Sequence, residues 1–438
     1  MRTTDNNWGC PISDELLTDL KLAGNQSLSE LVETNPGLLL FPGLLGAHGD
    51  RIGEQMIYSL NGKTLTTGNL MGFIGINDTQ LTVSSRFQRK ERDQDHFLHY
   101  LLQQVFALNI FDFKVDAGQD DIWDIFLFYL FPYFLNTALN QGLYKAYRQQ
   151  TYNDANVRGK IDIAGHLKHH RPFMGRIAYT TREHTYDNQV TELIRHTIHY
   201  MGRHPMGSAV LGGQAELRIN ISQIVQATPG FQAQQSRQIM ELNRKKVDHP
   251  FYTAYEPLRK LCLQILRREG LSTGREQDQV FGLVFDGAWL WEEYLNTLLA
   301  PLGYVHPQNK LGALGNPIYV FNNQTFSRFP DFYHRQQTAV LDAKYKPLFG
   351  RMGSELGRED LNQLIAYLYN LRAPKGAFIY PHDNDRTAAL GKLNGYGGEI
   401  FYYGMRIPSG HGDYAGFQRE MKLSEKQLTD YFKKLAVP

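Results

Sequence analysis

The spacing of apolar residues divides the chain into three stretches with different periods. Within residues 1–100, short apolar runs such as MIYSL, LMGFIGI and QLTVSSRF are separated by turn signals that include Asn61-Gly62 and Asn77-Asp78. Short runs bounded by glycine and asparagine are typical of strands joined by tight turns. Residues 1–100 are therefore predicted to be a β-rich N-terminal domain, a small sheet or open barrel, to which we assign partner binding below.

Residues 101–245 are predicted to be a helical middle region. HFLHYLLQQVFALNIF, which begins just before this region, carries apolar residues at helical spacing, and so does TREHTYDNQVTELIRHTIHYMGRHP, which stops before Pro205. The uncharged run Ile125–Leu139 has only about 15 residues, whereas a spanning helix needs about 20, so we expect a buried helix and no membrane segment. After the helix YEPLRKLCLQILRREG, which ends at Gly270, a domain boundary is expected between 245 and 280.

Residues 246–438 alternate between strand and helix patterns. IYVFNN, FSRFPDFYH, TAVLDAKYK and GAFIYP have the short apolar runs of strands, whereas GAWLWEEYLNTLL and EDLNQLIAYLYNL have helical spacing. Strands that alternate with helices predict a central mixed sheet flanked by helices. The predicted fold class is therefore α/β (mixed α+β), with a β-rich N-terminal domain, a helical middle region and this C-terminal domain.

Composition narrows the class of protein without giving a function. The chain has 46 basic and 44 acidic residues, a formal net charge of +2, so any nucleic-acid surface must come from local clustering. Two cysteines, Cys10 and Cys262, provide neither a disulfide framework nor a zinc spacing, and a cytoplasmic location is expected. The polar and acidic N-terminus Met1–Asp19 lacks the apolar run of a signal peptide.

The strand TAVLDAKYK carries the first candidate for chemistry. Residues two apart on a strand share a face, so Asp342 and Lys344 point the same way. A surface ion pair, worth about 0–1 kcal/mol, would explain this arrangement equally well. Asp331 changes the balance, because it follows Pro330 eleven positions earlier and a short turn would return the chain as a hairpin. Asp331 and Asp342 could then meet at one rim of the sheet.

Two carboxylates held together are costly unless a cation lies between them. Mg²⁺ is the natural occupant, because it prefers oxygen ligands and keeps several waters, and Mn²⁺ is expected to substitute. Such an ion would polarise a phosphodiester and lower the pKa of the attacking water. Lys344 would orient that water or stabilise charge on the pentavalent phosphate.

Two neighbouring helices offer accessory residues. Glu292 and Glu293 precede the hairpin, and a carboxylate there could approach the metal site; for Glu293 we favour a solvated position on the helix face. Gln363 and Tyr367 lie four apart and therefore share a helix face. They could arrange the site or hold a DNA phosphate, or they could simply cap buried backbone groups.

These residues together resemble the PD-(D/E)xK nuclease superfamily, with a proline–aspartate pair, a D-A-K strand, a glutamate in the preceding helix and Q-x-x-x-Y in the following one. The string DAKYKPLFGRMGSELGREDLNQLIAYLYNL, with the strand ending at Pro381, further resembles the McrC family of McrBC-type restriction systems. GLYKAY, VRGKIDI and HTYDNQVTELIRHTI are similar to other McrC segments, so that the likeness covers about residues 65–385. Ser84-Ser85-Arg86-Phe87 departs from the Pro-Lys that is common in the family.

The resemblance implies a PD-(D/E)xK nuclease domain at residues 246–438. It implies metal ligands at Asp331, Asp342 and the Ala343 carbonyl, a catalytic lysine at Lys344 and an accessory acid at Glu292. It also implies functional helix positions at Gln363 and Tyr367.

The resemblance further implies an endonuclease subunit that cuts modified, double-stranded DNA in antiviral defence. Its partner would be a McrB-like AAA+ GTPase ring whose hydrolysis it stimulates. The chain contains no G-x-x-x-x-G-K-[ST] sequence, so any nucleotide motor must be another chain. Two alternatives stay open: a self-sufficient RecB-like nuclease without a motor, and a non-catalytic scaffold that regulates an NTPase.

Overall fold

The computed structural model describes most of the chain, in two compact units. The described residues are 1–35, 38–41, 51–77, 79–87, 95–106, 119–169, 175–213, 215–247, 249–271, 280–307, 315–346, 357–395, 397–409 and 413–436. Unit 1 comprises Met1–Phe111 and Gln277–Pro438, and unit 2 comprises Asp112–Glu276. Unit 2 is thus inserted between two segments of unit 1. No helix in the described ranges is long and apolar enough to cross a membrane.

The first sheet of unit 1 combines strands that lie far apart in the sequence. Its order is β1-β7-β6-β11-β3. The strands are β1 (Arg2–Thr4), β3 (Leu38–Phe41), β6 (Leu70–Ile76), β7 (Thr79–Ser84) and β11 (Val280–Asp286). All of β6 is buried, as its unbroken apolar run predicts for a central strand, whereas β7 alternates along most of its length.

Smaller elements close the core beside this sheet. They are the sheet β2-β5-β4, formed by β2 (Cys10–Pro11), β4 (Tyr58–Asn61) and β5 (Thr64–Thr67), and the helices α1 (Asp14–Leu20), α2 (Leu28–Thr34) and η1 (Arg51–Glu54). Their apolar side chains, Leu65 among them, join those of β6, β7 and β11 in one cluster. The β-rich character predicted for this region is therefore observed.

The domain boundaries differ from those expected. β11 was assigned to a separate C-terminal domain beginning at 246, but it pairs with β6 along its whole length, from Val280 opposite Ile76 to Asp286 opposite Leu70. α10 (Tyr255–Leu271) packs against helices of unit 2 instead. The local apolar pattern identifies a strand but not the sheet that it joins, which explains the difference.

The second sheet of unit 1 has the order β12-β15-β16-β17-β19-β18. Its strands are β12 (Tyr304–Val305), β15 (Phe332–His334), β16 (Ala339–Ala343), β17 (Lys375–His382), β18 (Arg386–Lys392) and β19 (Glu399–Arg406), with the small hairpin β13 (Ile318–Tyr319) and β14 (Ser327–Arg328) beside it. β16, β17 and β19 are parallel, and the remaining neighbours are antiparallel. This is the mixed sheet that the sequence predicts.

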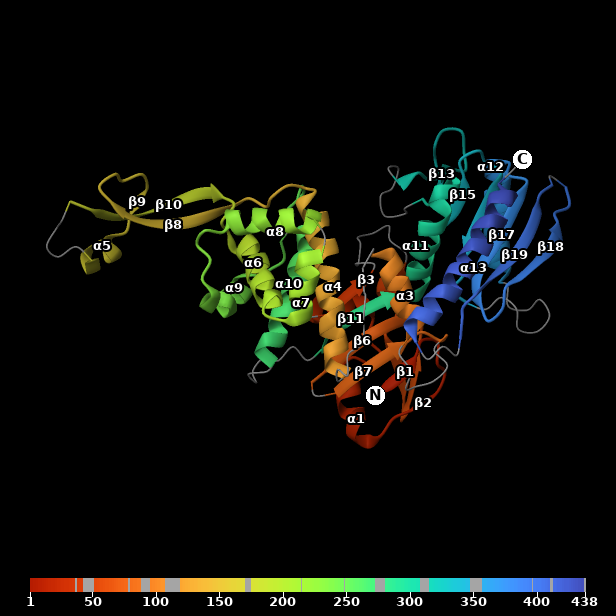
Figure 1. Cartoon of the computed structure of the whole chain (residues 1–438), viewed down its shortest axis with the longest axis horizontal. Coiled ribbons are helices and arrows are strands. Elements are labelled where there is room, and N and C mark those ends of the chain that lie inside the picture. Colours follow the sequence, from red (N-terminus) through yellow and green to blue (C-terminus); the bar gives the residue numbers. More distant parts are fainter. Residues whose placement is uncertain are drawn as a thin grey trace. The chain divides into compact units, whose positions relative to one another are not determined.

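Helices cover both faces of this second sheet. α12 (Arg358–Leu371) packs on β16 and β17, where its Leu364 and Leu368 meet Val340 and Phe378. On the other face α11 (Gly287–Leu299), followed by the short helix η3 (Ala300–Leu302), contacts β16, and α13 (Tyr414–Leu435) contacts β19 (Figure 1). α3 (His96–Val105) packs against α11 and α13. Because side chains alternate along β16, Asp342 shares the α12 face with Val340.

The core of unit 2 is a helical bundle. It contains α4 (Gln119–Leu139), α6 (Gln189–Gly202), α7 (Pro205–Gly213), α8 (Ala215–Ala227), η2 (Ala233–Gln235), α9 (Ser236–Leu242) and α10. The uncharged run in α4 is a buried helix, as expected: Leu130, Phe131 and Leu135 are inaccessible to solvent. Pro132 lies inside this helix.

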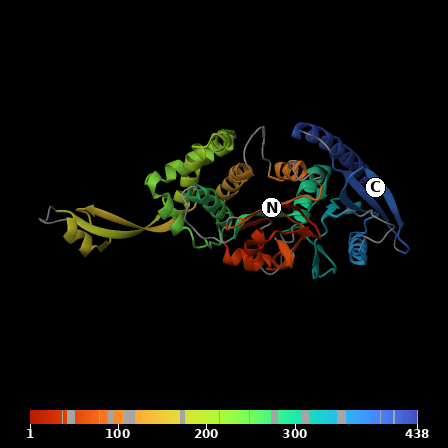
Figure 2. The same cartoon turned by 90° about the horizontal axis from the view of Figure 1, so that it is seen from below.

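Unit 2 also carries a β-ribbon that the prediction of a helical middle region missed. β8 (Ala146–Asp154) and β10 (Ile177–Thr185) pair antiparallel, β9 (Lys160–Ile161) pairs with β10, and α5 (Ile163–His169) packs against β10. Figures 1 and 2 show this arm, residues 146–185, extending away from the helices of unit 2. β8 buries none of its residues, and β10 buries only Ala178 and Tyr179. AYRQQTYND therefore has no alternation of apolar and polar residues to reveal the strand, and the pattern of TREHT predicts a helix instead.

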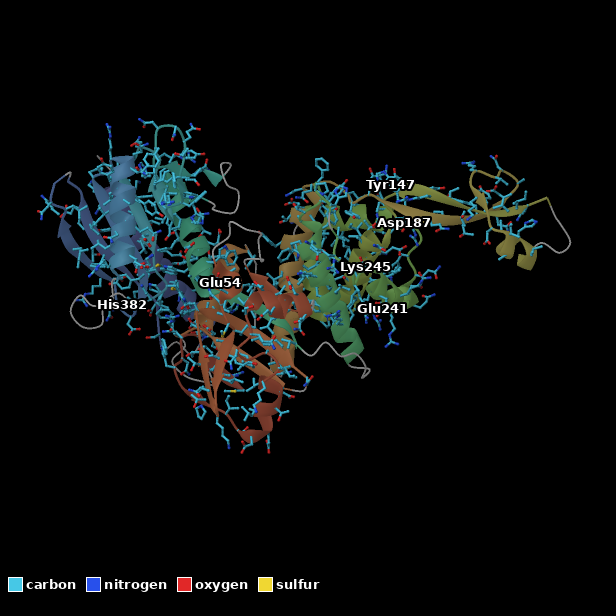
Figure 3. The ribbon with its side chains drawn as sticks, turned by 180° about the vertical axis from the view of Figure 1, so that it is seen from behind. Glu54, Tyr147, Asp187, Glu241, Lys245 and His382 are labelled. Carbon is cyan, nitrogen blue, oxygen red and sulfur yellow. The ribbon has the colours of Figure 1, made fainter. Side chains whose placement is uncertain are left out.

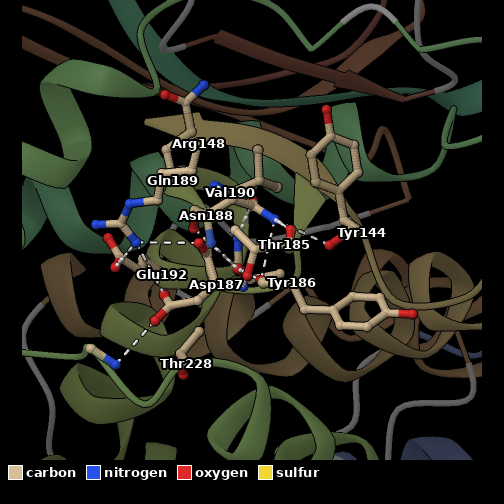
Figure 4. A network of polar contacts seen from close by, with 12 residues as sticks. Tyr144, Arg148, Thr185, Tyr186, Asp187, Asn188, Gln189, Val190, Glu192 and Thr228 are labelled. Atoms are coloured by element: carbon tan, nitrogen blue, oxygen red, sulfur yellow. Dashed lines mark hydrogen bonds and ion pairs between the residues drawn. The ribbon is translucent and has the colours of Figure 1, made fainter. Parts of the chain in front are cut away.

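A polar network joins the base of the arm to α6 (Figure 4), and Figure 3 labels Tyr147 and Asp187 at this base. Arg148 of β8 donates to Glu192 at 2.7 Å and to the Asp187 carboxylate at 3.2 Å. Asp187 also accepts from the Gly230 amide at 3.0 Å. The side chain of Asn188 accepts from the amides of Val190 and Thr191, which caps α6. The segment HTYDNQVTEL therefore connects the arm to the bundle.

Candidate active site

Asp331 lies where the sequence places it, at the start of a hairpin. β15 and β16 pair antiparallel, with Phe332 opposite Leu341, and the turn closes with Gln337 in the left-handed region at φ 57°. The amide of Ala343 donates to Asp331 Oδ2 at 2.7 Å. This bond fixes the Asp331 carboxylate beside the end of β16.

Asp342 and Lys344 complete the cluster. Lys344 Nζ lies 2.7 Å from Asp342 Oδ1 in an ion pair. Asp342 is only 3% exposed, and its Oδ1 has no correctly directed hydrogen-bond donor among the described residues. The two observations are compatible, because an ion pair needs only a short distance whereas a hydrogen bond also needs the angle.

The electrostatics of the cluster are set by two acids, Asp331 and Asp342, that are buried close together. Burial raises the pKa of Asp342 well above its usual range, and the adjacent Asp331 carboxylate raises it further. Burial also raises the pKa of Asp331, against the opposing effect of Lys344. Burial alone would lower the pKa of Lys344, but the carboxylates of Asp342 and Asp331 reverse this and raise it. One ammonium therefore faces two buried acids, and the raised pKa values mean that keeping both acids ionised is costly unless a further cation is bound.

The closeness of two buried acids makes the cluster chemically suited to a hard cation, which would stabilise both in the ionised form. Two buried carboxylates offer the oxygen ligands that Mg²⁺ prefers. Within the described ranges, no group of three or more His, Cys, Asp or Glu side chains is arranged to hold a metal. Any such ion would therefore rely on this pair, on a backbone carbonyl such as that of Ala343, and on water.

Of the two neighbouring glutamates, Glu293 differs from expectation. Glu293, for which a solvated position was favoured, is half-buried, and its Oε1 lies 3.8 Å from His306 Nε2. His306 Nδ1 lies 2.6 Å from the backbone oxygen of Asp331. Glu293 and this oxygen raise the pKa of His306 although its burial acts to lower it. Glu293 thus supports the backbone of Asp331 through His306, because helix packing turns this part of α11 toward β12.

Glu292 is also half-buried on α11, next to the buried Trp291. Its role as accessory acid stays a prediction.

Gln363 and Tyr367 contact each other on α12. Gln363 Nε2 donates to the Tyr367 hydroxyl at 2.8 Å, and this hydroxyl donates to the backbone oxygen of Phe329 at 3.4 Å. Phe329 lies two residues before Asp331, so the pair reaches the segment that leads into the cluster. Capping a backbone group, one of the two possibilities from the sequence, is what this geometry provides.

Asp360 was not predicted from the sequence. Its carboxylate lies 3.2 Å from Lys344 Nζ and 2.8 Å from Lys346 Nζ, and the two lysines lower its pKa although its burial acts to raise it. The one signal was an acid in the first turn of a predicted helix, which is common because it favours the helix dipole. The loop 347–356, which contains the Met352-Gly353 pair, is outside the described residues.

Unit 1 therefore presents a buried carboxylate–lysine cluster at the rim of a mixed sheet flanked by helices. Structural comparison finds a similar fold in a chain of a refined half-complex from a tetradecameric assembly of Thermococcus gammatolerans McrB AAA+ hexamers with bound McrC, with 14% identity and a TM-score of 0.50, covering 97% of this chain and 100% of that one. A chain of the Thermococcus gammatolerans McrBC complex matches with 11% identity and a TM-score of 0.35, covering 69% and 88%.

The family model for the McrBC 5-methylcytosine restriction system component matches residues 65–381, more than half of the chain. The chain belongs to this family. No curated protein matches it.

Proposed function

We propose that this chain is the DNA-cleaving subunit of a McrBC-like restriction system, a Mg²⁺-dependent endodeoxyribonuclease of the PD-(D/E)xK type. The observation that carries the proposal is the buried pair Asp331 and Asp342, with Lys344 at 2.7 Å from Asp342. The family match supports the restriction system. The cluster supports the chemistry, because a surface ion pair, the simpler explanation, would be exposed and would not include a second carboxylate.

Each residue of the cluster has a separate proposed role. Asp331 and Asp342, with the Ala343 carbonyl, would hold Mg²⁺, which when bound activates water and polarises a phosphodiester. Lys344 would orient the attacking water or stabilise the charge that develops on the phosphate. Asp360 and Asp342 hold the ammonium of Lys344 between them. His306, Gln363 and Tyr367 keep the backbone around Asp331 in place.

The partner we propose is a McrB-like AAA+ GTPase ring, and the substrate is double-stranded, modified DNA. The structurally similar Thermococcus gammatolerans chain comes from an assembly of McrB hexamers with bound McrC. The present chain has no phosphate-binding loop of its own. We place ring docking in the N-terminal part, roughly residues 1–245, which includes the arm of unit 2.

The arm offers this partner an apolar tip. Ile161, Ile163 and Leu167 are 48%, 69% and 49% exposed, whereas apolar side chains of a strand and a helix that pack together are normally covered. An exposed apolar tip on a projecting ribbon fits a protein partner.

The experiment is a cleavage assay on methylated duplex DNA with the full-length chain, the co-purified NTPase, its nucleotide and Mg²⁺. Wild type should cut and Asp342→Asn should not, with stimulation of NTP hydrolysis unchanged in the variant. If the chain cuts equally well alone, it is a self-sufficient nuclease. If both forms stimulate hydrolysis and neither cuts, the chain is a scaffold.

A further inference from the structure

The segment that follows Lys344 leaves the sheet and enters the N-terminal part of unit 1. The last ladder bond is the one that the Lys344 amide donates to the Ile379 oxygen at 2.8 Å, and β16 itself ends at Ala343. Tyr345 is only 4% exposed. Tyr345 lies beyond the end of β16, so the residues that hold its ring also constrain the backbone next to Lys344.

Those residues come from the N-terminal sheet and the start of α11. The Arg86 guanidinium lies 4.8 Å from the centroid of the Tyr345 ring, and the Phe87 ring lies 5.9 Å from it at 67°. The hydroxyl donates to Met71 Sδ at 3.4 Å. Opposite, a Cβ placed on Gly287 would lie 2.7 Å from the Tyr345 ring, so glycine is needed for this close approach.

Arg86 is itself held rigidly. Its Nε and Nη2 donate to Asp5 Oδ2 at 2.9 and 2.6 Å, its backbone amide donates to Asp5 Oδ1 at 2.5 Å, and Nη2 also donates to Asn69 Oδ1 at 2.7 Å. The Asp5 side chain is fully buried and that of Arg86 is 13% exposed. Burying an ion pair gains little over apolar packing, so what the pair provides here is a fixed geometry.

The same contacts extend to the helix that carries the glutamates. Phe87 packs edge-on against Phe97 at 5.2 Å, and Phe97 lies 6.3 Å from Trp291. The Trp291 Nε1 donates to the Ile379 oxygen at 3.5 Å, the same oxygen that receives the Lys344 amide. Arg86 and Phe87 thus contact the residue that follows Lys344, and Phe87 reaches Trp291 of α11 through Phe97.

We propose that Arg86 is a positioning residue for the nuclease site: through Tyr345 it sets the place of Lys344, so that the state of the N-terminal sheet regulates cleavage. The inference rests on the proposed function and adds the route by which a partner docked on the N-terminal part acts on the site. Arg86 lies in the segment where the family commonly has Pro-Lys, and the proposal assigns it the role of positioning Lys344 through Tyr345. If the contact were packing only, its loss would lower stability and leave turnover at low temperature unchanged.

The test compares Arg86→Met with Leu65→Ala in the full-length chain with its partner. Leu65 lies in the N-terminal core and is not one of the residues described above that hold the Tyr345 ring, so its variant lowers the stability of the same region. At a temperature well below both melting points, Arg86→Met should lower kcat at least ten-fold with KM for DNA unchanged. Leu65→Ala should leave kcat within two-fold, and Arg86→Lys, which keeps the charge, should recover part of the loss.

Amide hydrogen exchange supplies a readout that needs no cleavage. In Arg86→Met, exchange at the Lys344 amide should quicken at least ten-fold, and in Leu65→Ala it should keep the wild-type rate. Gly287→Ala, which displaces the Tyr345 ring from the other side, should behave as Arg86→Met does and replaces it if that variant does not fold. If Arg86→Met and Leu65→Ala have the same kcat as each other and the same exchange rate at the Lys344 amide, the inference is overturned. This holds even if Asp342→Asn is inactive. If wild type does not cut at all, the proposed function fails, and the exchange rates still decide whether Arg86 positions Lys344.

Discussion

β15–β16 in unit 1 and β8–β10 in unit 2 are two antiparallel strand pairs that use the same backbone pairing for opposite purposes. Every residue of β16 is buried, and its one acid, Asp342, is buried with them. In the arm, β8 buries none of its residues and β10 buries only Ala178 and Tyr179, and the strands are fixed at their base by Arg148 and Asp187. A buried carboxylate costs stability, and an exposed ribbon adds little, so each hairpin departs from what folding alone favours. Such departures are where function is expected.

The largest effect is expected when the acid of the buried hairpin is removed. Asp342→Ala should abolish DNA cleavage, and Lys344→Ala should lower its rate by about 10²-fold or more, because the first deletes a proposed metal ligand and the second a charge stabiliser. Asp342→Ala should not destabilise the fold, since it relieves the repulsion by Asp331. Cleavage by plasmid nicking and thermal unfolding measure the two effects. Wild-type cleavage in Asp342→Ala would rule out the metal-site assignment.

Removing the metal is the second test, and it leaves the chain unchanged. Because Asp331 and Asp342 supply only oxygen ligands, EDTA should stop cleavage, and Mg²⁺ or Mn²⁺ should restore it. Calorimetry should show Mg²⁺ binding to the wild type and none to Asp342→Asn. Full activity in EDTA would contradict the assignment.

The sequence predicted the buried hairpin well and the exposed one not at all. Asp331, Asp342 and Lys344 could be placed together because the spacing allows only a short turn, and strand alternation fixes which side chains share a face. AYRQQTYND gave no signal, because a ribbon exposed on both sides has no apolar period. Glu293 and Asp360 depend on how α11 and α12 rotate against the sheet, and β11 depends on a partner more than 200 residues away. None of these is a local property.

Shortening the exposed hairpin is the third test. A deletion of residues 1–245 would strip β11 of its neighbours β6 and β3 and would confound docking with unfolding. We therefore replace residues 149–182 with Asn-Gly, which joins the paired Arg148 and Glu183 by a two-residue turn and keeps the ion pair of Arg148 with Glu192. Stimulation of the partner's NTP hydrolysis should fall at least ten-fold. The stability of unit 1, measured by hydrogen exchange in β16, should stay the same.

The matched control for the arm keeps its fold and changes only its tip. Ile163→Ser with Leu167→Ser removes the exposed apolar side chains and should weaken stimulation several-fold. Undiminished stimulation by the shortened chain would show that the ring docks elsewhere in the N-terminal part.

The smallest expected effect concerns pH and compares one buried histidine in each unit. Burial lowers the pKa of His196 in α6 to about 4, with His199 and Arg195 adding to the shift, and burial lowers the pKa of His99 in α3 to about 3. Between these values and 6.5, the unfolded chain binds a proton that the folded chain does not. Stability is therefore complete above pH 6.5 and is lost as the pH falls below it.

For His196 the loss between pH 7 and pH 5 is on the order of 1 kcal/mol, since one pKa unit corresponds to about 1.4 kcal/mol and part of the shift is screened. His196→Gln should flatten the pH dependence of unfolding in unit 2, and His99→Gln should do so in unit 1, where His99 stacks on Tyr414 at 4.1 Å. Hydrogen exchange resolved by peptide follows the two units separately. A variant that flattens the profile of both units equally would show that they unfold as one, because in that case a proton taken up in either unit shifts a single shared equilibrium.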